Sequence, residues 1–236
     1  MTTLVLIPGL VSDGRVWKSL ADAARPHMPV HDALPTQYET IPDMAKAILE
    51  DVDGDLIAAG HSLGGRIAME MAHQAPGRVK GLVLANTGHG PKREGEEVKR
   101  HEMIALGKRD MARLADVWLP PMLDDARLGD EALVADLTAM VLRAGPEVHE
   151  RQIRALIARP NATACLKDIT CPVLLIAAHQ DKWSPVAQHE EIASLLGGES
   201  EMAIIGNAGH FAPVERPEAV TRAVMDWLKR YFSVGN

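Results

Sequence analysis

Short apolar runs alternate along the chain with stretches in which apolar residues recur at helical spacing. Each run ends at a glycine, a proline or a polar residue, which is typical of strands that are buried on both faces of a parallel sheet. Strands are expected at residues 3–7, 29–34, 56–60, 79–85, 173–178 and 202–205. Because the strands alternate with helices, the pattern predicts an α/β fold whose sheet is doubly wound, mostly parallel and made of about six strands.

The helical stretches differ between two parts of the chain. Apolar stripes within residues 17–24, 44–49 and 67–72 predict helices that pack one face on the sheet. Residues 88–165 instead carry charges and helical spacing, and contain no run that suits a strand. We therefore expect a core formed by residues 1–87 and 166–236, with residues 88–165 inserted as an all-helical cap over the carboxyl edge of the sheet.

Composition narrows the class of protein. The chain has 236 residues, of which 47% are apolar, so a single core can form without disulfides or metals. Its net charge is -7, and lysines and arginines are scattered among acids rather than gathered in a basic stripe. This argues against a nucleic-acid partner and favours a small-molecule substrate that is neutral or moderately polar. Either a monomer or a homodimer is compatible with the sequence.

Cofactor and membrane signals are weak. The two cysteines, Cys165 and Cys171, do not have the spacing of metal ligands, so no metal site is predicted. Residues 60–65 lack the lysine of a phosphate-binding loop, and no dinucleotide-binding glycine pattern follows the first strand, so no cofactor is expected. The chain enters its first strand without a leader, and no apolar run approaches 18 residues, which predicts a cytoplasmic protein without a membrane partner.

Residues 60–65, Gly-His-Ser-Leu-Gly-Gly, stand between a predicted strand and a predicted helix. A serine in such a turn can hold its hydroxyl clear of the backbone, and the glycines two positions to either side allow close packing of strand and helix. A glycine-rich turn without chemistry is the plainer alternative. We interpret Ser62 as a nucleophile because of the residues that follow two later strands.

Asp181 and His210 follow the predicted strands 173–178 and 202–205. Since ligands bind at the carboxyl ends of parallel strands, both side chains are expected on the same edge as Ser62. An aspartate before a turn is usually a cap, and a histidine beside glycine is usually a solvated loop residue. Their occurrence together at the expected places favours a catalytic triad, with His210 as general base and Asp181 as the acid that orients it.

Backbone amides are the candidates for an oxyanion hole. The Leu63 amide lies at the predicted helix start, directly after Ser62, and the Leu10 amide lies in the loop that Pro8 and Gly9 open after the first strand. Two such donors stabilise the oxygen that becomes negative when serine attacks a carbonyl, typically by about 3 kcal/mol per donor.

These motifs together resemble the alpha/beta-hydrolase superfamily. The resemblance rests on residues 4–9, residues 60–65, the loop of Asp181 with Pro185, and residues 207–211 followed by Glu-Arg-Pro-Glu at 215–218. It covers nearly the whole chain, and the helical insertion falls where that family places its cap. The chain departs from the family at Pro8, where a histidine is usual, and it lacks the two usual N-terminal strands.

The resemblance implies a serine hydrolase that cleaves a small carboxylic ester, thioester or lactone through an acyl-enzyme. Relatives that cleave cyanohydrins carry lysine after the catalytic histidine, where this chain has Phe211, and dehalogenases use an aspartate in place of Ser62. A carbon-carbon bond hydrolase, a cofactor-free perhydrolase and a non-catalytic ligand-binding receptor remain as alternatives. The candidate substrate-binding side chains, for which core packing is the alternative, are Trp118, Met122, Leu123 and Trp183.

Overall fold

A six-stranded sheet forms the centre of the molecule. A computed structural model describes residues 2–232 and 234. In it the strands follow the order β2-β1-β3-β4-β5-β6, and each neighbouring pair is parallel. The strands are β1 (Thr3–Ile7), β2 (Val30–Asp32), β3 (Leu56–His61), β4 (Val79–Ala85), β5 (Val173–Ala178) and β6 (Ser200–Ile205). The predicted fold class is confirmed.

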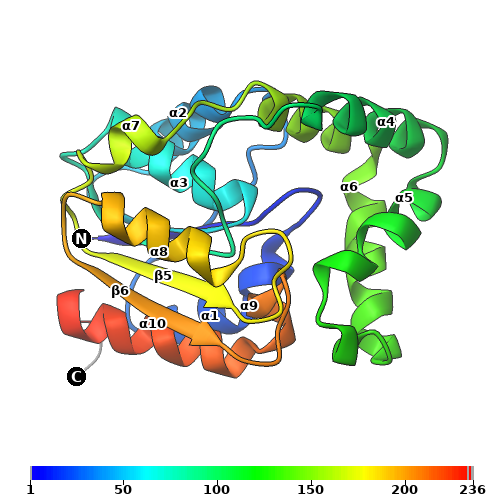
Figure 1. Ribbon diagram of the computed structural model, residues 1–236. Coiled ribbons are helices and arrows are strands. Elements are labelled where there is room, and N and C mark those ends of the chain that lie inside the picture. The colour runs from blue at the N-terminus through cyan, green and yellow to red at the C-terminus, as the bar shows by residue number, and fades with distance from the viewer. Residues whose placement is uncertain (1, 233, 235–236) are drawn as a thin grey trace.

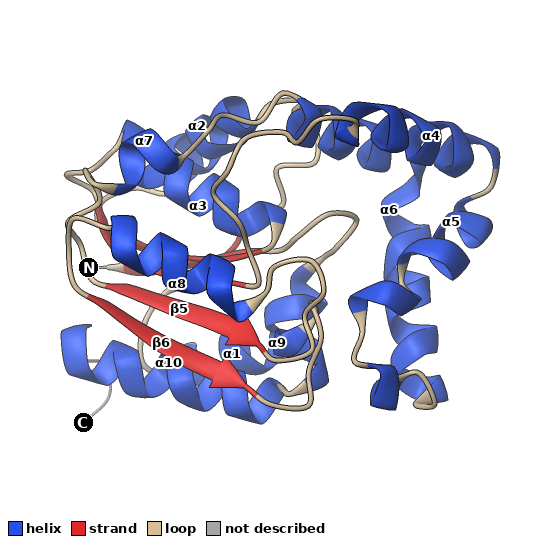
Figure 2. Cartoon of the chain, in the orientation of Figure 1, coloured by secondary structure: helices blue, strands red, loops and turns tan. Residues whose placement is uncertain are grey.

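Helices cover both faces of the sheet, as Figures 1 and 2 show. On one face pack α2 (Ile41–Asp51), α3 (Leu63–Gln74) and α8 (Val186–Leu195); on the other pack α1 (Lys18–Ala24) and α10 (Pro217–Phe232). A short 3-10 helix, η1 (Gly14–Trp17), precedes α1, and α9 (Ala212–Glu215) precedes α10.

Alternation along each strand divides the core into two layers. In β1, Val5 packs with the helices of one face, whereas Leu4 and Leu6 pack with those of the other. Successive side chains of a strand point to opposite faces, so a run that is apolar at every position fills both layers. The edge strands are less uniform: β6 alternates between exposed and partly buried residues, and β2 spans only three residues.

All the regular elements between β4 and β5 are helices. It contains α4 (Glu96–Arg109), α5 (Met111–Trp118), η2 (Pro120–Met122), η3 (Asp125–Arg127), α6 (Glu131–Ile157) and α7 (Thr163–Leu166). Figure 1 shows α5 and α6 beyond the carboxyl ends of β5 and β6, and α7 back beside the core. Helix α6 bends at Gly145, whose φ of 76° interrupts the helix just before Pro146. The division into core and cap at residues 88–165 stays a prediction.

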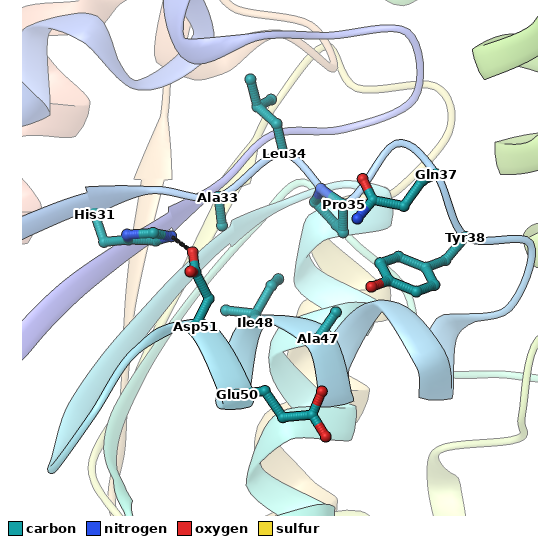
Figure 3. Close-up of a pocket in the computed structure, with 10 residues that line it drawn as sticks. All are labelled: His31, Ala33, Leu34, Pro35, Gln37, Tyr38, Ala47, Ile48, Glu50 and Asp51. Carbon is teal, nitrogen blue, oxygen red and sulfur yellow. Dashed lines mark ion pairs between the residues drawn. The ribbon is translucent and has the colours of Figure 1, made fainter.

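A pocket of about 390 Å³ lies between β2 and α2 (Figure 3). His31 and Asp51 face each other across it at 3.2 Å, and Tyr38 lies at its other end. None of its lining residues is a predicted site residue. Within the described residues, no helix combines the length and the apolar character that crossing a membrane requires.

Candidate active site

Ser62 occupies a strained turn between β3 and α3. Its φ of 53° and ψ of -113° lie outside the regions that most residues adopt. The two flanking glycines make the turn possible: a Cβ on Gly60 would lie 2.2 Å from the Gly64 carbonyl oxygen, and one on Gly64 would lie 2.1 Å from the Ile7 carbonyl oxygen. The turn therefore packs against its own helix and against β1 at distances that only glycine allows.

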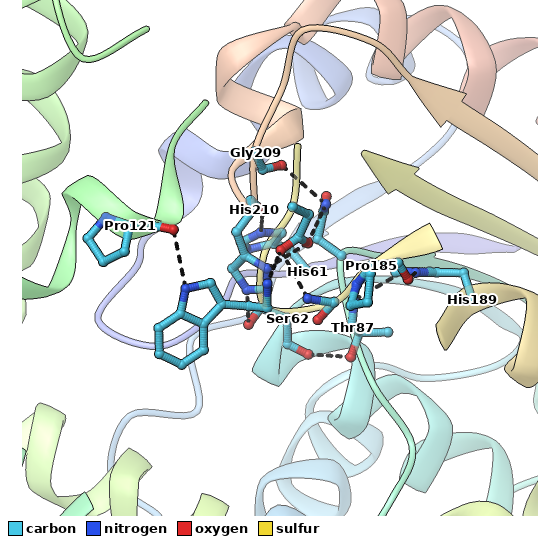
Figure 4. Close-up of polar contacts among 12 residues, drawn as sticks. His61, Ser62, Thr87, Pro121, Pro185, His189, Gly209 and His210 are labelled. Carbon is cyan, nitrogen blue, oxygen red and sulfur yellow. Dashed lines mark hydrogen bonds and ion pairs between the residues drawn. The ribbon is translucent and has the colours of Figure 1, made fainter. Parts of the chain in front are cut away.

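The structure brings the three predicted catalytic side chains together, and two of them, Ser62 and His210, are labelled in Figure 4. His210 Nε2 lies 2.8 Å from Ser62 Oγ, and His210 Nδ1 lies 2.9 Å from Asp181 Oδ2. The three residues come from the ends of β3, β5 and β6, and both His210 and Asp181 are buried. Such an arrangement lets the imidazole take a proton from the hydroxyl while the carboxylate holds it in the required tautomer.

Backbone amides hold the Asp181 carboxylate. Its Oδ1 accepts hydrogen bonds from the amides of Trp183, at 2.8 Å, and Ser184, at 3.0 Å. Burial alone would raise the pKa of Asp181, but the charge of His210 and the hydrogen bonds from His210, Ser184 and Asn86 outweigh it. The pKa of Asp181 therefore lies well below its usual range, and the side chain is a carboxylate near neutral pH.

Asn86 is a site residue that the sequence analysis missed. It follows β4 directly, is fully buried, and donates through Nδ2 to Asp181 Oδ2 at 3.0 Å. Its φ of 47° is one that asparagine tolerates better than most residues. The available signal was its place: a polar residue straight after a buried strand, on the edge where Ser62 and Asp181 also lie.

His61 lies beside the triad and supports its backbone. Its Nε2 donates to the His210 carbonyl oxygen at 2.7 Å, and its ring lies against that of Phe211, with centroids 5.3 Å apart. Burial, together with the nearby charge of His210, lowers the pKa of His61 to about 3. His61 is therefore neutral at physiological pH and acts as a hydrogen-bond donor rather than as a second base.

Glu215 links the His210 loop to the helical segment. Its two carboxylate oxygens accept from the amides of Gly209, at 2.9 Å, and Asp124, at 2.8 Å. The His210 amide also donates to the Met122 carbonyl oxygen. Burial raises the pKa of Glu215, although these amide donors counteract it. The sequence showed Glu215 only as part of a resemblance, because its partner at 124 lies 91 positions away.

The predicted oxyanion donors lie at the expected places. Leu63 is the first residue of α3, and Leu10 lies in the loop that follows β1. No backbone carbonyl within residues 2–232 accepts a hydrogen bond from either amide. Gly9 brings this loop against the nucleophile, since a Cβ on it would lie 3.2 Å from Ser62 Cβ. The role of both amides as an oxyanion hole stays a prediction.

The four candidate substrate-binding side chains lie in different environments. Met122 and Leu123 are buried, and Trp118 is partly buried with its ring edge against Phe211, at a centroid distance of 6.1 Å. Trp183 is 51% exposed and donates through Nε1 to the Pro121 carbonyl oxygen at 3.3 Å, a contact drawn in Figure 4. Contact between any of them and a substrate stays a prediction.

The pocket at β2 lies apart from this site. The pocket has no residue in common with the triad or with the predicted oxyanion amides. Across residues 2–232 and 234, no three histidine, cysteine, aspartate or glutamate side chains gather as metal ligands would.

Comparisons with known proteins identify relatives. The sequence model described as "Alpha/beta hydrolase family" matches residues 4–223. The pimeloyl-acyl-carrier-protein methyl ester esterase of Aromatoleum aromaticum is 26% identical over 253 residues, which cover 96% of this chain and 98% of that protein. Among solved structures, a thermophilic esterase from Thermogutta terrifontis has a TM-score of 0.88 at 22% identity, over 98% of this chain and 90% of that chain. The enol-lactonase from Burkholderia xenovorans LB400 has a TM-score of 0.83 at 22% identity, over 97% and 91%.

Proposed function

The chain belongs to the alpha/beta hydrolase family, and on this premise we propose that it is a serine hydrolase acting on a small carboxylic ester, thioester or lactone. One observation carries the proposal: the chain of hydrogen bonds from Ser62 through His210 to Asp181, at 2.8 and 2.9 Å. The relative from Aromatoleum aromaticum is named as a methyl ester esterase, which supports an ester as the bond that is cleaved.

In the proposed first half-reaction, Ser62 Oγ attacks the carbonyl carbon of the substrate and its proton passes to His210 Nε2. The carbonyl electron pair moves to oxygen, where the amides of Leu10 and Leu63 bind the negative charge. Asp181 stabilises the imidazolium through Nδ1. When the carbonyl re-forms, the bond to the alcohol or thiol breaks, and this leaving group takes the proton from His210.

In the second half-reaction, water replaces the alcohol. His210 accepts a proton from the water as its oxygen attacks the acyl carbon, and the same two amides bind the second oxyanion. Collapse breaks the bond to Ser62 Oγ, which takes back its proton, and releases a carboxylic acid. We assign Trp118, Met122, Leu123 and Trp183 as candidate lining for the acyl or alcohol group, which suits an apolar, uncharged substrate.

The experiment measures intact mass after treatment with a fluorophosphonate, beside turnover of p-nitrophenyl esters of increasing acyl length. We expect the wild type to gain one adduct and to hydrolyse the short esters, and Ser62→Ala to do neither. Ser194→Ala is the matched control, because Ser194 is an exposed serine on α8, and it should be labelled like the wild type. Equal turnover by Ser62→Ala would remove Ser62 from the mechanism, and a wild type without label or turnover would favour a binding protein.

A further inference from the structure

Val11, in the loop beside the predicted oxyanion hole, has an unusual backbone. Its φ is 46°, in the left-handed region that β-branched residues rarely enter, and its side chain is fully buried. Such a conformation persists only where the surroundings fix it. Val11 directly follows Leu10, so whatever fixes its backbone also bears on the direction of the Leu10 amide.

Gln152, on the second half of α6, contacts this backbone. Its side-chain oxygen accepts a hydrogen bond from the Val11 amide at 2.7 Å, across 141 positions of sequence, and Gln152 is only 5% exposed. The amide proton of Val11 requires an acceptor, which fixes the orientation of the Gln152 amide group. This buried contact joins the helical insertion to the loop after β1.

Two carbonyl oxygens of the loop accept hydrogen bonds from within it. The Leu10 carbonyl oxygen accepts from Ser12 Oγ at 3.0 Å, and the Gly9 carbonyl oxygen accepts from the Ser12 amide at 3.3 Å. With the Val11 amide taken by Gln152, both ends of the peptide group between Leu10 and Val11 are held. No backbone carbonyl within residues 2–232 accepts from the Leu10 amide, and its neighbour Gly9 packs against Ser62.

Two ion pairs at the surface join α6 to the loop after β1 and to η1. Arg143 lies 2.9 Å from Asp13, and Arg15 lies 3.1 Å from Asp136. Their side chains are between 34% and 51% exposed, so solvent screens these pairs and they fix the loop only weakly. The Gln152 contact is the buried one among these three.

We propose that Gln152 is a positioning residue for the oxyanion hole. By accepting from Val11 it holds the strained loop, keeps the Val11 amide from turning into the site, and leaves the Leu10 amide as the donor on that side. The inference rests on the proposed serine-hydrolase function. It makes the helical insertion part of the transition-state machinery in addition to any role in substrate binding.

The test compares Gln152→Met with the wild type and with Arg143→Gln. Methionine has the length of glutamine but offers the Val11 amide no comparable acceptor, whereas Arg143→Gln removes an exposed contact between the same helix and the same loop. Active sites are titrated with a fluorophosphonate, and kcat and KM for p-nitrophenyl acetate are expressed per titrated site. Circular dichroism checks that each variant is folded.

A short-chain trifluoromethyl ketone reports on the oxyanion hole directly. Ser62 Oγ adds to its carbonyl carbon, the serine proton passes to His210, and the ketone oxygen becomes an oxyanion that the two amides bind. Because loss of a whole oxyanion donor costs about 10²–10³ in kcat, we expect its displacement in Gln152→Met to lower kcat by about 10- to 100-fold. KM should stay within about twofold, ketone affinity should fall by a factor similar to that in kcat, and Arg143→Gln should match the wild type.

Gln152→Ala is the second variant. It leaves space for a water to bond to the Val11 amide, so it should fold even where the methionine variant does not. Because this water is not attached to α6, it does not hold the loop in place, and kcat should still fall. The proposal is overturned if a folded variant keeps kcat within about twofold, if only KM changes, or if kcat falls while ketone affinity is unchanged. A wild type that turns over no ester would instead refute the proposed function, before any variant is made.

Discussion

Among the described residues, four other than glycine have a positive φ: Val11, Ser62, Asn86 and Asn207. Each follows the carboxyl end of a strand, namely β1, β3, β4 and β6. Backbone strain is thus concentrated at the edge of the sheet where the triad lies. Strained residues persist where surrounding contacts hold them, and here those contacts also fix Ser62, Asn86 and the loop that contains Leu10 and Val11.

In the proposed mechanism Asp181 acts through the tautomer and charge of His210, so its replacement should reduce kcat far more than it affects folding. In Asp181→Asn the amide can donate to Nδ1, which places the imidazole proton on Nε2, where a base is needed. We expect kcat for p-nitrophenyl acetate to fall by about 10³- to 10⁴-fold. A fall of less than about tenfold, in a variant that is folded by circular dichroism, would show that another acid supports His210.

Asn86 donates a hydrogen bond to Asp181 and would act on the reaction only through it. Removing its hydrogen bond should raise the pKa of Asp181 and weaken its hold on the imidazolium, lowering kcat by about tenfold, or 1.4 kcal/mol. Asn86→Gly and Asn86→Ala should show this loss alike, whereas only the alanine variant places a Cβ at a φ of 47° and loses additional stability. Equal kcat in the wild type and Asn86→Gly would mean that the bond does not contribute to catalysis.

At the scale of elements, Glu215 connects α9 and the His210 loop to the segment between η2 and η3. Its carboxylate uses both oxygens on backbone amides, those of Gly209 and Asp124. The close approach is also visible at Gly209, where a Cβ would lie 2.6 Å from the Asp124 amide nitrogen and the Met122 carbonyl oxygen. One buried residue, Glu215, therefore connects the loop of His210 to the helical insertion.

Glu215→Gln should weaken this connection between the His210 loop and the helical insertion. A glutamine can accept from only one of the two amides and would direct its own N–H groups at the other, which leaves a buried donor unsatisfied. We expect the free energy of unfolding, measured by urea titration, to fall by about 1–3 kcal/mol. The control is Glu218→Gln, an exposed glutamate in the first turn of α10, which should change stability by about 0.5 kcal/mol or less. A similar change in both variants would contradict a role for Glu215 in holding the segment.

The sequence predicted those elements whose pattern does not depend on distant neighbours. Strands β1, β4 and β5 agree with the expected bounds, because nearly all of their residues are apolar or small and buried; Lys80 in β4 is the exposed exception. The edge strands differ: β2 is shorter than the expected 29–34, and β6 begins at Ser200 rather than Met202. An edge strand is partly exposed, so its apolar pattern marks its ends less clearly.

The site residues also differ in how clearly the sequence marks them. Ser62, Asp181 and His210 could be found because each follows a strand in a loop with a chemical signature. Asn86 was marked only by its place after a buried strand, and its partner lies 95 positions away. Gln152 carried no signal, because a glutamine on a helix does not indicate a partner 141 positions away that only folding brings to it.

At the scale of the whole molecule, histidines buried as neutral groups set the response to acid. Burial lowers the pKa of His61 to about 3 and that of His149, in α6, to about 4. Burial also lowers the pKa values of His89 and His189. These residues lie in the core, in the helical insertion and in the loop after β4, so the effect is spread over the whole fold.

Because the folded-state pKa of each of these histidines lies below its ordinary value of 6.5, the unfolded chain binds more protons between the two values. Stability should therefore be highest above pH 6.5 and fall as the pH drops towards 3. For His61 and His149 the loss between pH 7 and pH 5 is about 2 kcal/mol each. Urea titrations at half-unit pH steps measure this loss. His149→Leu should reduce the slope of the free energy of unfolding against pH by up to about 1.4 kcal/mol per pH unit, which is the contribution of one proton. A free energy of unfolding that stays constant from pH 7 to pH 5 would show that these histidines are not held neutral by the fold.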